Sequence, residues 1–333
     1  MPTKTLEQLH DLVYKALVNA GTSPGNAAIV TDALIAAEGD GLRSHGLARV
    51  ASYADQVKSG KVDGRAKPEV SLTAKAALRV NANSGFAFPA IKAGLERATE
   101  LVRETGVVCV AVGHSHHSGA FGYHVEGLAR AGLVGLGFSN SPAGIAPWGG
   151  KVPIFGTNPV AFGCPRKVGD PLVVDMSLAK VARGKIKLAA DKGEQIPEGW
   201  AVDADGNPTT DAKAAMKGSN TPMGDAKGYA LVLVTEILSA IMTGSHFGAE
   251  ASSFFAAEGP PPHVGQLFVI FDPDAFAGPG FQDRLEVLFG AILGQKGTRL
   301  PGQRRYEARA RIKRDGVKLD DALLADLEAR AAG

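Results

Sequence analysis

A serine, a histidine and an arginine stand within six positions of one another in the segment GLRSHGLARV, residues 41–50. If Ser44 caps a helix, His45 lies in its first turn and Arg49, four residues later, shares its face. A helix start disfavours the imidazolium, so His45 would serve as a base or as a readily discharged acid near neutral pH. The Ser44 hydroxyl could bond either the backbone or the imidazole, and the planar guanidinium of Arg49 suits a carboxylate. The segment predicts a clamp for a 2-oxo, 2-hydroxy or 2-imino acid that moves one proton, although spacing alone fits a plain capped helix equally well.

A second group of polar residues contains four of the eight histidines, in the segment GHSHHSGAFGYHVEGLARAG, residues 113–132. His114 and His116 would project to one side of an extended segment, but no Cys or carboxylate stands at a helpful spacing, so we expect no metal. The small residues Ser118, Gly119 and Ala120 follow a predicted strand and precede a predicted helix. Free backbone N–H groups at such a helix start favour an anion. The segment predicts a phosphate cradle, with a plain capped helix as the alternative.

Several common catalytic motifs are absent from the sequence. There is no G-x-G-x-x-G between a strand and a helix, and Gly132, Gly135 and Gly137 have the reversed order at a passage from helix to strand. The segment GAILGQKGT, residues 290–298, departs from a P-loop because Gly297 follows the lysine. Neither G-x-S-x-G nor H-E-x-x-H occurs. These absences argue against a Rossmann dinucleotide fold, ATP hydrolysis, a serine hydrolase and a zinc peptidase.

The elements that must position these residues change in character along the chain. Apolar residues at helical spacing predict helices over 5–20, 23–39 and 44–60, the first with a capping box at Thr5 and Gln8. From residue 69 onward short β-branched runs predict strands. The predicted strands are VSLTA, ALRVNA, GVVCVAVGH, GLVGLGFSN, PVAFGC, PLVVDMS and, as the last one, GQLFVIFDP (265–273). Further helices are predicted over 88–104, 119–131, 227–244 and within 281–333, and residues 190–226 read as a long polar excursion with tight turns.

Composition limits the function classes that remain. The chain has 333 residues, enough for two modest domains, with 45% hydrophobic and 21% charged residues. No run approaches the roughly 18 apolar residues of a membrane span, and the N-terminus lacks a secretory signal. Only two cysteines occur, Cys109 and Cys164, which favours the cytoplasm. The net charge of +2 and the scarcity of aromatics in the basic stretch 296–314 argue against nucleic-acid binding.

The chain resembles the malate/L-lactate dehydrogenase family of NAD(P)-dependent oxidoreductases over nearly its whole length. The resemblance is carried, in order, by RSHGLAR (43–49), HHSGA (116–120), FGTNPVAF (155–162), VVDMSLAKVARGKI (173–186), IPEGWAVDADGNPTTD (196–211) and KGYALVLVTEIL (227–238). It implies an α+β fold distinct from the Rossmann type. A helical domain of residues 1–75, completed by C-terminal helices 285–333, would serve substrate binding and dimerisation. Residues 76–284 would form an NAD(P)-binding domain around a mixed, largely antiparallel sheet.

The same resemblance implies roles for individual residues. His45 would be the proton donor or acceptor, Ser44 its hydrogen-bonding partner and Arg49 the anchor of the substrate carboxylate. His117 would also approach the substrate, so the histidine that moves the proton stays open. The implied cofactor-binding residues are His116, His117, Ser118, Gly119, Ala120, Ser141, Thr157, Asp175, Met176, Ser177, Gly184, Lys185, Lys227, Gly228, Lys296, Thr298 and Arg299.

Within the family, the segments SGKVDGRAKPEV (59–70), SGFAFPA (84–90) and GTRLPGQRRY (297–306) look most like the reductases of Δ1-pyrroline-2-carboxylate and Δ1-piperideine-2-carboxylate. We therefore expect NADPH-dependent reduction of these cyclic imines to proline and pipecolate by a homodimer. NADPH is favoured over NADH because Lys296 or Arg299 could meet the 2′-phosphate. One departure is Lys185, which stands where an imine reductase has a relay aspartate and hydroxy-acid dehydrogenases have lysine. A dehydrogenase of malate, lactate or ureidoglycolate is therefore the alternative, and a non-catalytic binding protein a remote one.

Overall fold

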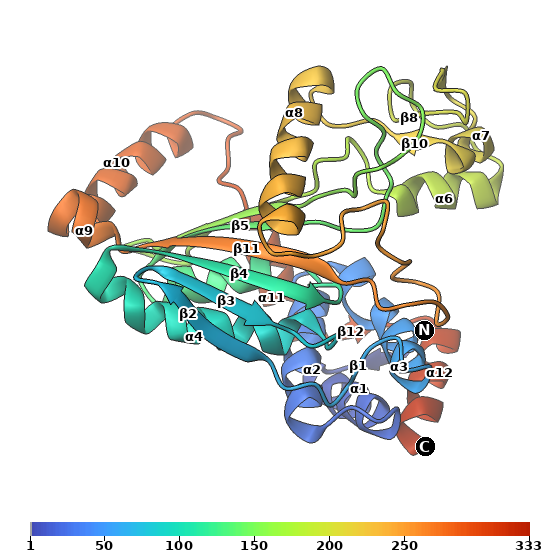
Figure 1. Cartoon of the computed structure of the whole chain (residues 1–333), viewed down its shortest axis with the longest axis horizontal. Helices are drawn as coiled ribbons and strands as arrows, with labels where there is room; N and C mark the ends of the chain where they lie inside the picture. The colour runs from blue at the N-terminus through green and yellow to red at the C-terminus, as the bar shows by residue number, and fades with distance from the viewer. Residues whose placement is uncertain (1) are drawn as a thin grey trace.

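Seven strands form one mixed sheet through the middle of the computed structural model, which describes residues 2–333 (Figure 1). Their order across the sheet is β2-β3-β4-β11-β5-β6-β7. The strands are β2 (Glu69–Ala74), β3 (Ala77–Asn81), β4 (Val107–Ser115), β5 (Val134–Ser139), β6 (Val160–Cys164), β7 (Leu172–Met176) and β11 (Val264–Phe271). Only the β3–β4 pair is parallel, which confirms the predicted mixed, largely antiparallel sheet.

The strand predicted to come last in the sequence lies at the centre of the sheet. Strand β11 pairs antiparallel with β4 on one side and with β5 on the other, so Phe268 lies opposite both Val110 and Gly137. Gly137 permits this packing, because a Cβ there would lie 2.8 Å from the Phe121 ring. The apolar pattern of β11 predicts a buried strand, but period-two alternation carries no information on which strands become its neighbours.

Helices cover both faces of the sheet. On one face, α4 (Ala87–Thr105) and α5 (Gly122–Arg130) bury Ile91, Val102 and Val125 against the strands. On the other face lies α8 (Asp225–Glu236), which continues into a π-helical turn at Ile237–Ile241 (Figure 1). Two apolar layers, one on each face, thus hold the central strands, which carry on their ends the segments predicted to be functional.

The N-terminal helices form a separate cluster that the end of the chain completes. It contains α1 (Leu6–Asn19), α2 (Pro24–Gly39) and α3 (Val50–Lys58), and the predicted capping box of Thr5 and Gln8 is present. Helix α12 (Asp321–Ala332) packs on α1, α11 (Gln303–Asp315) contacts α2, and the short strands β1 (Thr3–Lys4) and β12 (Val317–Lys318) pair. The cluster buries Leu9, Leu34 and Leu327. The two chain ends therefore lie in the same helical unit (Figure 1).

The segment predicted as a long polar excursion, 190–226, is instead part of a small folded layer. Helices α6 (Arg183–Lys192) and α7 (Ala212–Lys217) pack beside a three-stranded sheet of β8 (Ala201–Val202), β9 (Pro208–Thr209) and β10 (Ser219–Asn220). Ile186, Ala201 and Ala215 form its core. The prediction of a loop was wrong because a few dispersed apolar residues suffice for a core when tight turns bring them together.

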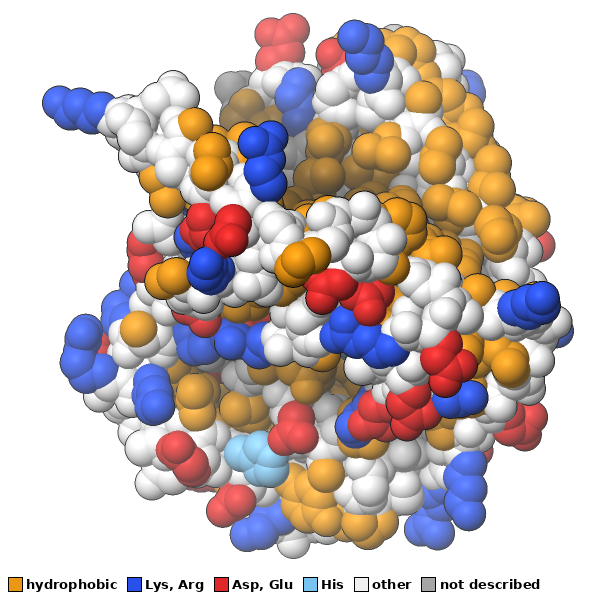
Figure 2. All heavy atoms as spheres, turned by 90° about the vertical axis from the view of Figure 1, so that its left-hand side faces the viewer, with side chains coloured by type: hydrophobic (Ala, Val, Ile, Leu, Met, Phe, Trp, Pro, Cys, Tyr) orange, Lys and Arg blue, Asp and Glu red, His pale blue; other side chains and the backbone are white. Residues whose placement is uncertain are grey.

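A helical arm projects from the body of the molecule. It consists of α9 (Pro273–Ala277), a 3₁₀ turn at Gly278–Gly280 and α10 (Phe281–Leu293) (Figure 1). Phe276, Val287 and Leu288 on this arm are exposed, and apolar side chains gather over the face of the molecule that bears it (Figure 2). The predicted division into residues 1–75 with 285–333 and residues 76–284 remains a prediction. The β2–β3 hairpin crosses its first boundary, α10 lies on the arm, and residue 1 is outside the described residues.

An ionic network joins the C-terminal helices to the rest of the chain. The guanidinium of Arg309 on α11 donates to both Glu126 oxygens, at 2.8 and 3.0 Å, and to Asp40 Oδ1 at 2.8 Å. Arg309→Met would leave two nearly buried carboxylates without this partner. We expect the free energy of unfolding to fall by about 2 kcal/mol, less than the value for a fully buried pair because a third of Arg309 is in solvent. Urea denaturation measures this loss.

A matched control is Arg314→Met, because Arg314 on the same helix is 73% exposed and pairs only with its neighbour Asp315 among the described residues. We expect a change below about 0.5 kcal/mol for this variant. Equal losses in the two variants would contradict a specific role for Arg309 in joining the units.

Candidate active site

The turn that carries Ser44, His45 and Arg49 differs from its prediction. Two 3₁₀ turns, Arg43–His45 and Leu47–Arg49, precede α3, and the cap of α3 is Arg49, so the prediction of Ser44 as its N-cap was wrong. Gly46 lies between the two turns, and its backbone packs closely against α2. A Cβ on Gly46 would lie 2.4 Å from Glu38 Oε2, so a larger residue would not fit there. The Glu38 carboxylate accepts the Leu47 N–H at 3.1 Å. Freed from capping, the Ser44 hydroxyl lies 3.0 Å from His45 Nδ1, which is the second of the two predicted partners.

Arg49 is buried with one edge of its guanidinium unused. Its Nε donates to the Ser44 carbonyl at 2.8 Å, so the side chain folds back onto the turn that carries His45. Its Nη1 is buried and has no hydrogen-bond partner among residues 2–333. A buried cation whose donor has no partner costs free energy unless an anion accepts a hydrogen bond from that donor. The geometry therefore fits an acid whose carboxylate binds at this edge, beside His45.

His117 comes from the end of β4 and meets the N-terminal helices at this turn. Its Nδ1 lies 2.6 Å from the hydroxyl of Tyr53 on α3, and its ring centroid lies 5.7 Å from that of His45. Burial raises the pKa of Tyr53, so its hydroxyl stays protonated and can donate to Nδ1. His117 would then carry its own proton on Nε2. The structure thus brings His45, His117 and Arg49 together, as the sequence predicts.

Burial and a neighbouring positive charge keep the histidines neutral. Burial, and then the charge of Arg49, lower the pKa of His45 to about 4 and that of His116 to about 3. The pKa of His117 lies well below its usual value for the same two reasons. The predicted depression of the His45 pKa is present, but its cause is burial and Arg49 and not a helix start. At neutral pH the site offers neutral imidazoles that can accept a proton.

This neutrality predicts how stability changes with pH. Burial lowers the pKa of His124 as well, to about 4, so four histidines stay unprotonated in the fold but bind protons near pH 6.5 when unfolded. The unfolded state then holds more protons below this pH. The free energy of unfolding should fall as the pH drops from about 6.5 toward about 4, by up to about 1.4 kcal/mol per pH unit for each histidine. Urea denaturation at several pH values measures this slope, and equal stability across this range would contradict it.

The segment predicted as a phosphate cradle lies in a loop and not at a helix start. Helix α5 begins at Gly122, whose N–H donates to Asp175 Oδ2 at 2.8 Å, so the helix start already holds a carboxylate. The N–H groups of Ser118, Gly119 and Ala120 have no backbone acceptor among residues 2–333. Gly119 has a φ of +68°, and a Cβ there would lie 2.7 Å from the Phe88 ring. The loop therefore presents free donors, although the dipole argument used to predict them applies to Gly122.

Histidine 116 stands at the start of this loop in an aromatic enclosure. Its ring is 1% exposed and contacts the rings of Tyr53, Phe86 and Phe254 at centroid distances of 5.2, 5.8 and 5.5 Å. Neither ring nitrogen has a hydrogen-bond partner in the described chain. His116 therefore has a packing role in this structure. A contact between its unpartnered nitrogens and a cofactor or substrate stays a prediction.

Ser141, Thr157 and Ser177, three of the other predicted cofactor residues, are joined through the backbone of Thr157. Thr157 donates its N–H to the Ser141 hydroxyl at 3.0 Å, and Ser177 donates its hydroxyl to the Thr157 carbonyl at 3.3 Å. Asp175 lies on β7, and its carboxylate accepts a hydrogen bond from the Arg305 guanidinium at 3.0 Å. Met176, the last residue of β7, is exposed. The end of β7 is thus tied to both α5 and α11.

The remaining predicted cofactor residues lie at or beyond the ends of elements, and all of them except the buried Gly228 are exposed. Gly184 and Lys185 occupy the first turn of α6, and Lys227 and Gly228 the first turn of α8. A Cβ at Gly228 would lie 1.5 Å from the Met223 carbonyl oxygen, so this glycine has a packing reason. Lys296, Thr298 and Arg299 are exposed and follow the arm, in a segment between α10 and α11 without helix or strand.

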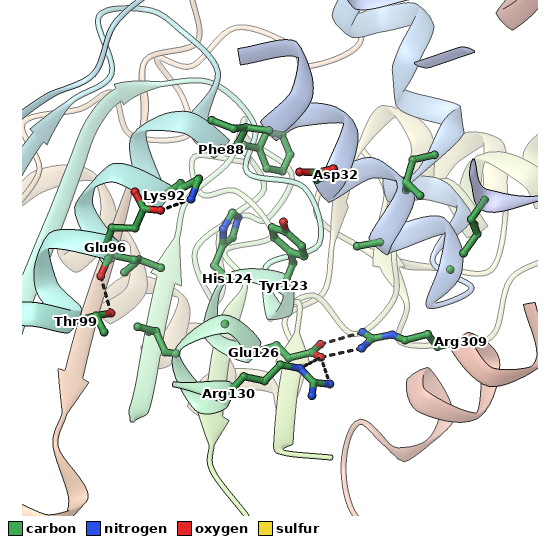
Figure 3. Close-up of a pocket in the computed structure, with 18 residues that line it drawn as sticks. Asp32, Phe88, Lys92, Glu96, Thr99, Tyr123, His124, Glu126, Arg130 and Arg309 are labelled. Atoms are coloured by element: carbon green, nitrogen blue, oxygen red, sulfur yellow. Dashed lines mark hydrogen bonds and ion pairs between the residues drawn. The ribbon is translucent and has the colours of Figure 1, made fainter. Parts of the chain in front are cut away.

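The molecule has a cavity of about 730 Å³ (Figure 3). It is lined by residues of α2, α4 and α5, including Asp32, Lys92, Tyr123 and Glu126, and does not contain the Arg49 site. His124 lines it and reaches the loop of residues 118–120, with Nε2 2.9 Å from the Ser118 carbonyl oxygen. Several of its ionic groups are paired with one another, Glu126 with Arg130 and Arg309 and Lys92 with Glu96 (Figure 3).

Sequence reasoning missed three aromatic residues of the site. Tyr53 reads in the sequence as an apolar position of a helix, and Phe254 and Phe255 lie in a Gly- and Pro-rich segment with no motif. The structure places Phe254 on His117, at 4.8 Å between ring centroids, and Phe255 4.6 Å from the Arg49 guanidinium carbon. Two adjacent aromatics amid turn residues, SSFF at 252–255, are the signal that could have suggested a wall around a site.

Two further properties concern metals and membranes. In the described part of the chain, no three or more His, Cys, Asp or Glu side chains are arranged to hold a metal ion. Among residues 2–333, no helix combines the length and hydropathy that a membrane crossing requires.

A family model described as malate/L-lactate dehydrogenase matches residues 5–328. The chain belongs to the malate/L-lactate dehydrogenase family. This membership confirms the predicted resemblance, and the absence of a G-x-G-x-x-G motif no longer argues against a dinucleotide-dependent enzyme.

Individual relatives within the malate/L-lactate dehydrogenase family match the whole chain. A (2R)-3-sulfolactate dehydrogenase (NADP(+)) of Chromohalobacter salexigens is 51% identical over 98% of this chain and 97% of the relative. A Δ1-pyrroline-2-carboxylate/Δ1-piperideine-2-carboxylate reductase of Pseudomonas aeruginosa is 40% identical over 97% of both chains. The crystal structure of Δ1-piperideine-2-carboxylate reductase from Pseudomonas syringae pv. tomato superposes with a TM-score of 0.94 at 38% identity, covering 99% of this chain and all of that one.

These matches confirm the predicted α+β, non-Rossmann fold of the malate/L-lactate dehydrogenase family. They also show that the chain is an oxidoreductase, because the family and its matched members are dehydrogenases and reductases.

Proposed function

We propose that this enzyme interconverts a small 2-hydroxy acid and its 2-oxo acid with NADP(H), with 3-sulfolactate as the leading substrate. The observation that carries the reaction is the pairing of a neutral His45 with the free guanidinium edge of Arg49 on a single turn. A neutral imidazole accepts the hydroxyl proton in the oxidation direction. The substrate assignment is supported by the sulfolactate dehydrogenase that is 51% identical over nearly the whole chain.

The residues divide the work in this proposal. Arg49 binds the carboxylate and thereby sets the 2-hydroxyl next to the imidazoles. His45 accepts the hydroxyl proton at Nε2, because its Nδ1 faces the Ser44 hydroxyl, which holds the ring. His117, held by Tyr53, contacts the same oxygen and stabilises the charge that develops there. In the reverse direction the same groups must return one proton to the substrate oxygen.

The nicotinamide cofactor, when bound, supplies or removes the hydride. The loop of Ser118, Gly119 and Ala120 fits its pyrophosphate, since three backbone N–H groups there lack backbone acceptors within residues 2–333. We assign the remaining predicted cofactor residues to other parts of the cofactor. Lys296 and Arg299 would contact the 2′-phosphate, which favours NADPH over NADH. The relative named as NADP(+)-dependent supports this preference.

Reduction of Δ1-pyrroline-2-carboxylate and Δ1-piperideine-2-carboxylate is the second candidate. It is favoured by the reductase that is 40% identical and by the superposed reductase structure. A cyclic imine can enter already protonated, and the depressed pKa of His45 and His117 then matters little, since no strong acid is required. The same Arg49 clamp would hold its carboxylate.

A panel of substrates separates the candidates. We expect NADP+ reduction at 340 nm with 3-sulfolactate, and lower rates with malate, lactate and ureidoglycolate. The two cyclic imines would be tested in the reduction direction, and every substrate with both NADP(H) and NAD(H). Faster turnover of a cyclic imine than of any 2-oxo acid would reverse the assignment. NADP(H) should raise the melting temperature, and a melting temperature unchanged by either cofactor would contradict the proposed use of NADP(H).

We further propose that the protein is a cytoplasmic homodimer. Phe276 and Val287 on the arm and Ile241 on the π-helical turn after α8 are exposed, and apolar side chains gather over the face of the molecule that bears the arm (Figure 2). Exposed apolar areas of this extent support an interface between two copies. Cys109 and Cys164 are unpaired thiols, as expected in a reducing compartment. Light scattering after gel filtration measures the mass, and a monomer would refute the dimer.

A further inference from the structure

A long loop, residues 247–262, lies between the π-helical turn after α8 and strand β11 and crosses the active site. Its base is closed where the N–H of His246 donates to the His263 carbonyl at 2.8 Å. Two bonds hold its first residues to the body, from Gly248 N–H to Glu236 Oε1 and from Ala143 N–H to the Gly248 carbonyl. The distal part, residues 252–258, reaches α3 and the turn of Arg49.

The two phenylalanines of this loop contact different active-site groups. Phe254 is buried and packs on the rings of His117 and His116. Phe255 is 73% exposed, yet it covers the Arg49 guanidinium, with the guanidinium carbon 4.6 Å from the ring centroid. Its ring lies over one face of the guanidinium, whereas the buried Nη1 at the edge has no hydrogen-bond partner in the described residues.

A buried lysine fastens this loop. The ammonium of Lys61, on a residue only 2% exposed, donates to the carbonyls of Ser253, Ala256 and Glu258 at 2.7, 3.0 and 3.1 Å. An ammonium has three donors, so all of them are used by this one loop. Burying a cation is costly without such bonds, and an apolar residue would fill the space more cheaply. Gln56 and Ser59 on the same segment add bonds to the Ala256 and Ala257 carbonyls.

We propose that Lys61 and Phe255 are substrate-positioning residues. Lys61 fixes the loop, and the loop sets the Phe255 ring on one face of Arg49, so that a carboxylate binds only at the guanidinium edge, in line with His45. The ring also keeps water from that face, which strengthens the ion pair formed at the edge. This inference rests on the proposed function to the extent that the substrate is an acid bound by Arg49.

Variants of Phe255 test the ring itself. Phe255→Leu keeps an apolar side chain but removes the flat face, and we expect the KM for the acid to rise about fivefold. The kcat and the KM for NADPH should not change, because Phe255 contacts neither His45 nor the predicted cofactor loop. Phe255→Tyr should behave as the wild type, because it restores an aromatic face. Val168→Ala, which alters an equally exposed apolar residue elsewhere, serves as the control.

Variants of Lys61 test the fastening. Lys61→Met should raise the KM for the acid as Phe255→Leu does, and should speed deuterium exchange of the 253–258 amides by at least about tenfold. Lys61→Arg, which can donate to the same carbonyls, should recover most of both effects. Lys58→Met, at an exposed lysine of α3, is the matched control and should change neither. Phe255 lies at the surface, so its variants keep the test valid even if Lys61→Met fails to fold.

Binding of oxalate, a planar dicarboxylate, separates this inference from the choice of substrate. We expect calorimetry to show weaker oxalate binding to Phe255→Leu and Lys61→Met than to the wild type, by about the same factor as the KM. If this holds while no substrate of the panel turns over, the positioning role stands and the proposed substrate falls. Unchanged acid KM and oxalate affinity in both variants of an active enzyme would overturn the inference.

Discussion

Arg49→Met is expected to lower kcat/KM for the acid substrate about 1000-fold, because it removes the charge-assisted hydrogen bonds that we propose Arg49 makes to the carboxylate. Most of this loss should fall on the KM, since the carboxylate is bound equally in the ground state and the transition state. The variant also loses the bond from Nε to the Ser44 carbonyl, 2.8 Å long, that shapes the turn of His45. A smaller fall in kcat should therefore accompany the rise in KM. Steady-state kinetics with saturating cofactor measures both.

Arg49→Lys separates charge from geometry. A lysine keeps the positive charge but has neither the planar fork nor a second donor aligned with the first, so we expect about a 100-fold loss. Arg43→Met is the matched control, because Arg43 lies on the same turn with its side chain 66% exposed. It should retain nearly full activity. If Arg43→Met lost as much as Arg49→Met, the carboxylate would bind elsewhere on the turn.

His45→Ala is the second variant with a large expected effect, a loss of about 100- to 10,000-fold in kcat for reduction of a 2-oxo acid. An alkoxide develops on that substrate as the hydride arrives, so the reaction depends steeply on a proton donor. A protonated cyclic imine needs much less help, and its reduction should suffer less. Kinetics of the variant on one substrate of each kind measures the difference, with His10→Ala, a surface histidine, as control. Equal losses on both substrates would contradict the mechanism.

The wild-type pH profile gives an independent check on His45. Burial and Arg49 lower its pKa to about 4 in the free protein, so the neutral, proton-accepting form is present above that value. Oxidation of the hydroxy acid, measured as kcat/KM, should therefore stay level from about pH 8 down to about pH 5 and decline only as the pH approaches 4. A midpoint near 6.5, the ordinary value for histidine, would contradict the lowered pKa of His45.

Local signals in the sequence predicted many elements of the fold. The helix at residues 6–19 and its capping box, and the strands now labelled β2 to β7, follow from apolar spacing and β-branched runs, which act over a few neighbouring residues. The start of α5 was misplaced by three positions and the cap at Ser44 was wrong. At both places a backbone N–H donates to a carboxylate outside the predicted helix. Gly122 donates to Asp175 at the start of α5, and Leu47 donates to Glu38 beside Ser44.

The candidate site divides in the same way. Ser44, His45 and Arg49 lie within one turn, so their proximity follows from the chain itself, and ordered sequence blocks indicate the family. His117 meets Tyr53 across 64 residues, and the Lys61 ammonium meets the Ala256 carbonyl across 195. No periodicity reports contacts of that separation.

The sequence alone determined which residues could do chemistry in GLRSHGLARV, the mixed sheet with its helices, and the family. Tertiary structure alone decided that β11 enters the centre of the sheet, that burial and Arg49 rather than a helix dipole keep His45 neutral, and that Phe255 covers Arg49. The physical reason is that propensity and spacing act along the chain, whereas burial, charge and strand pairing depend on which distant segments meet.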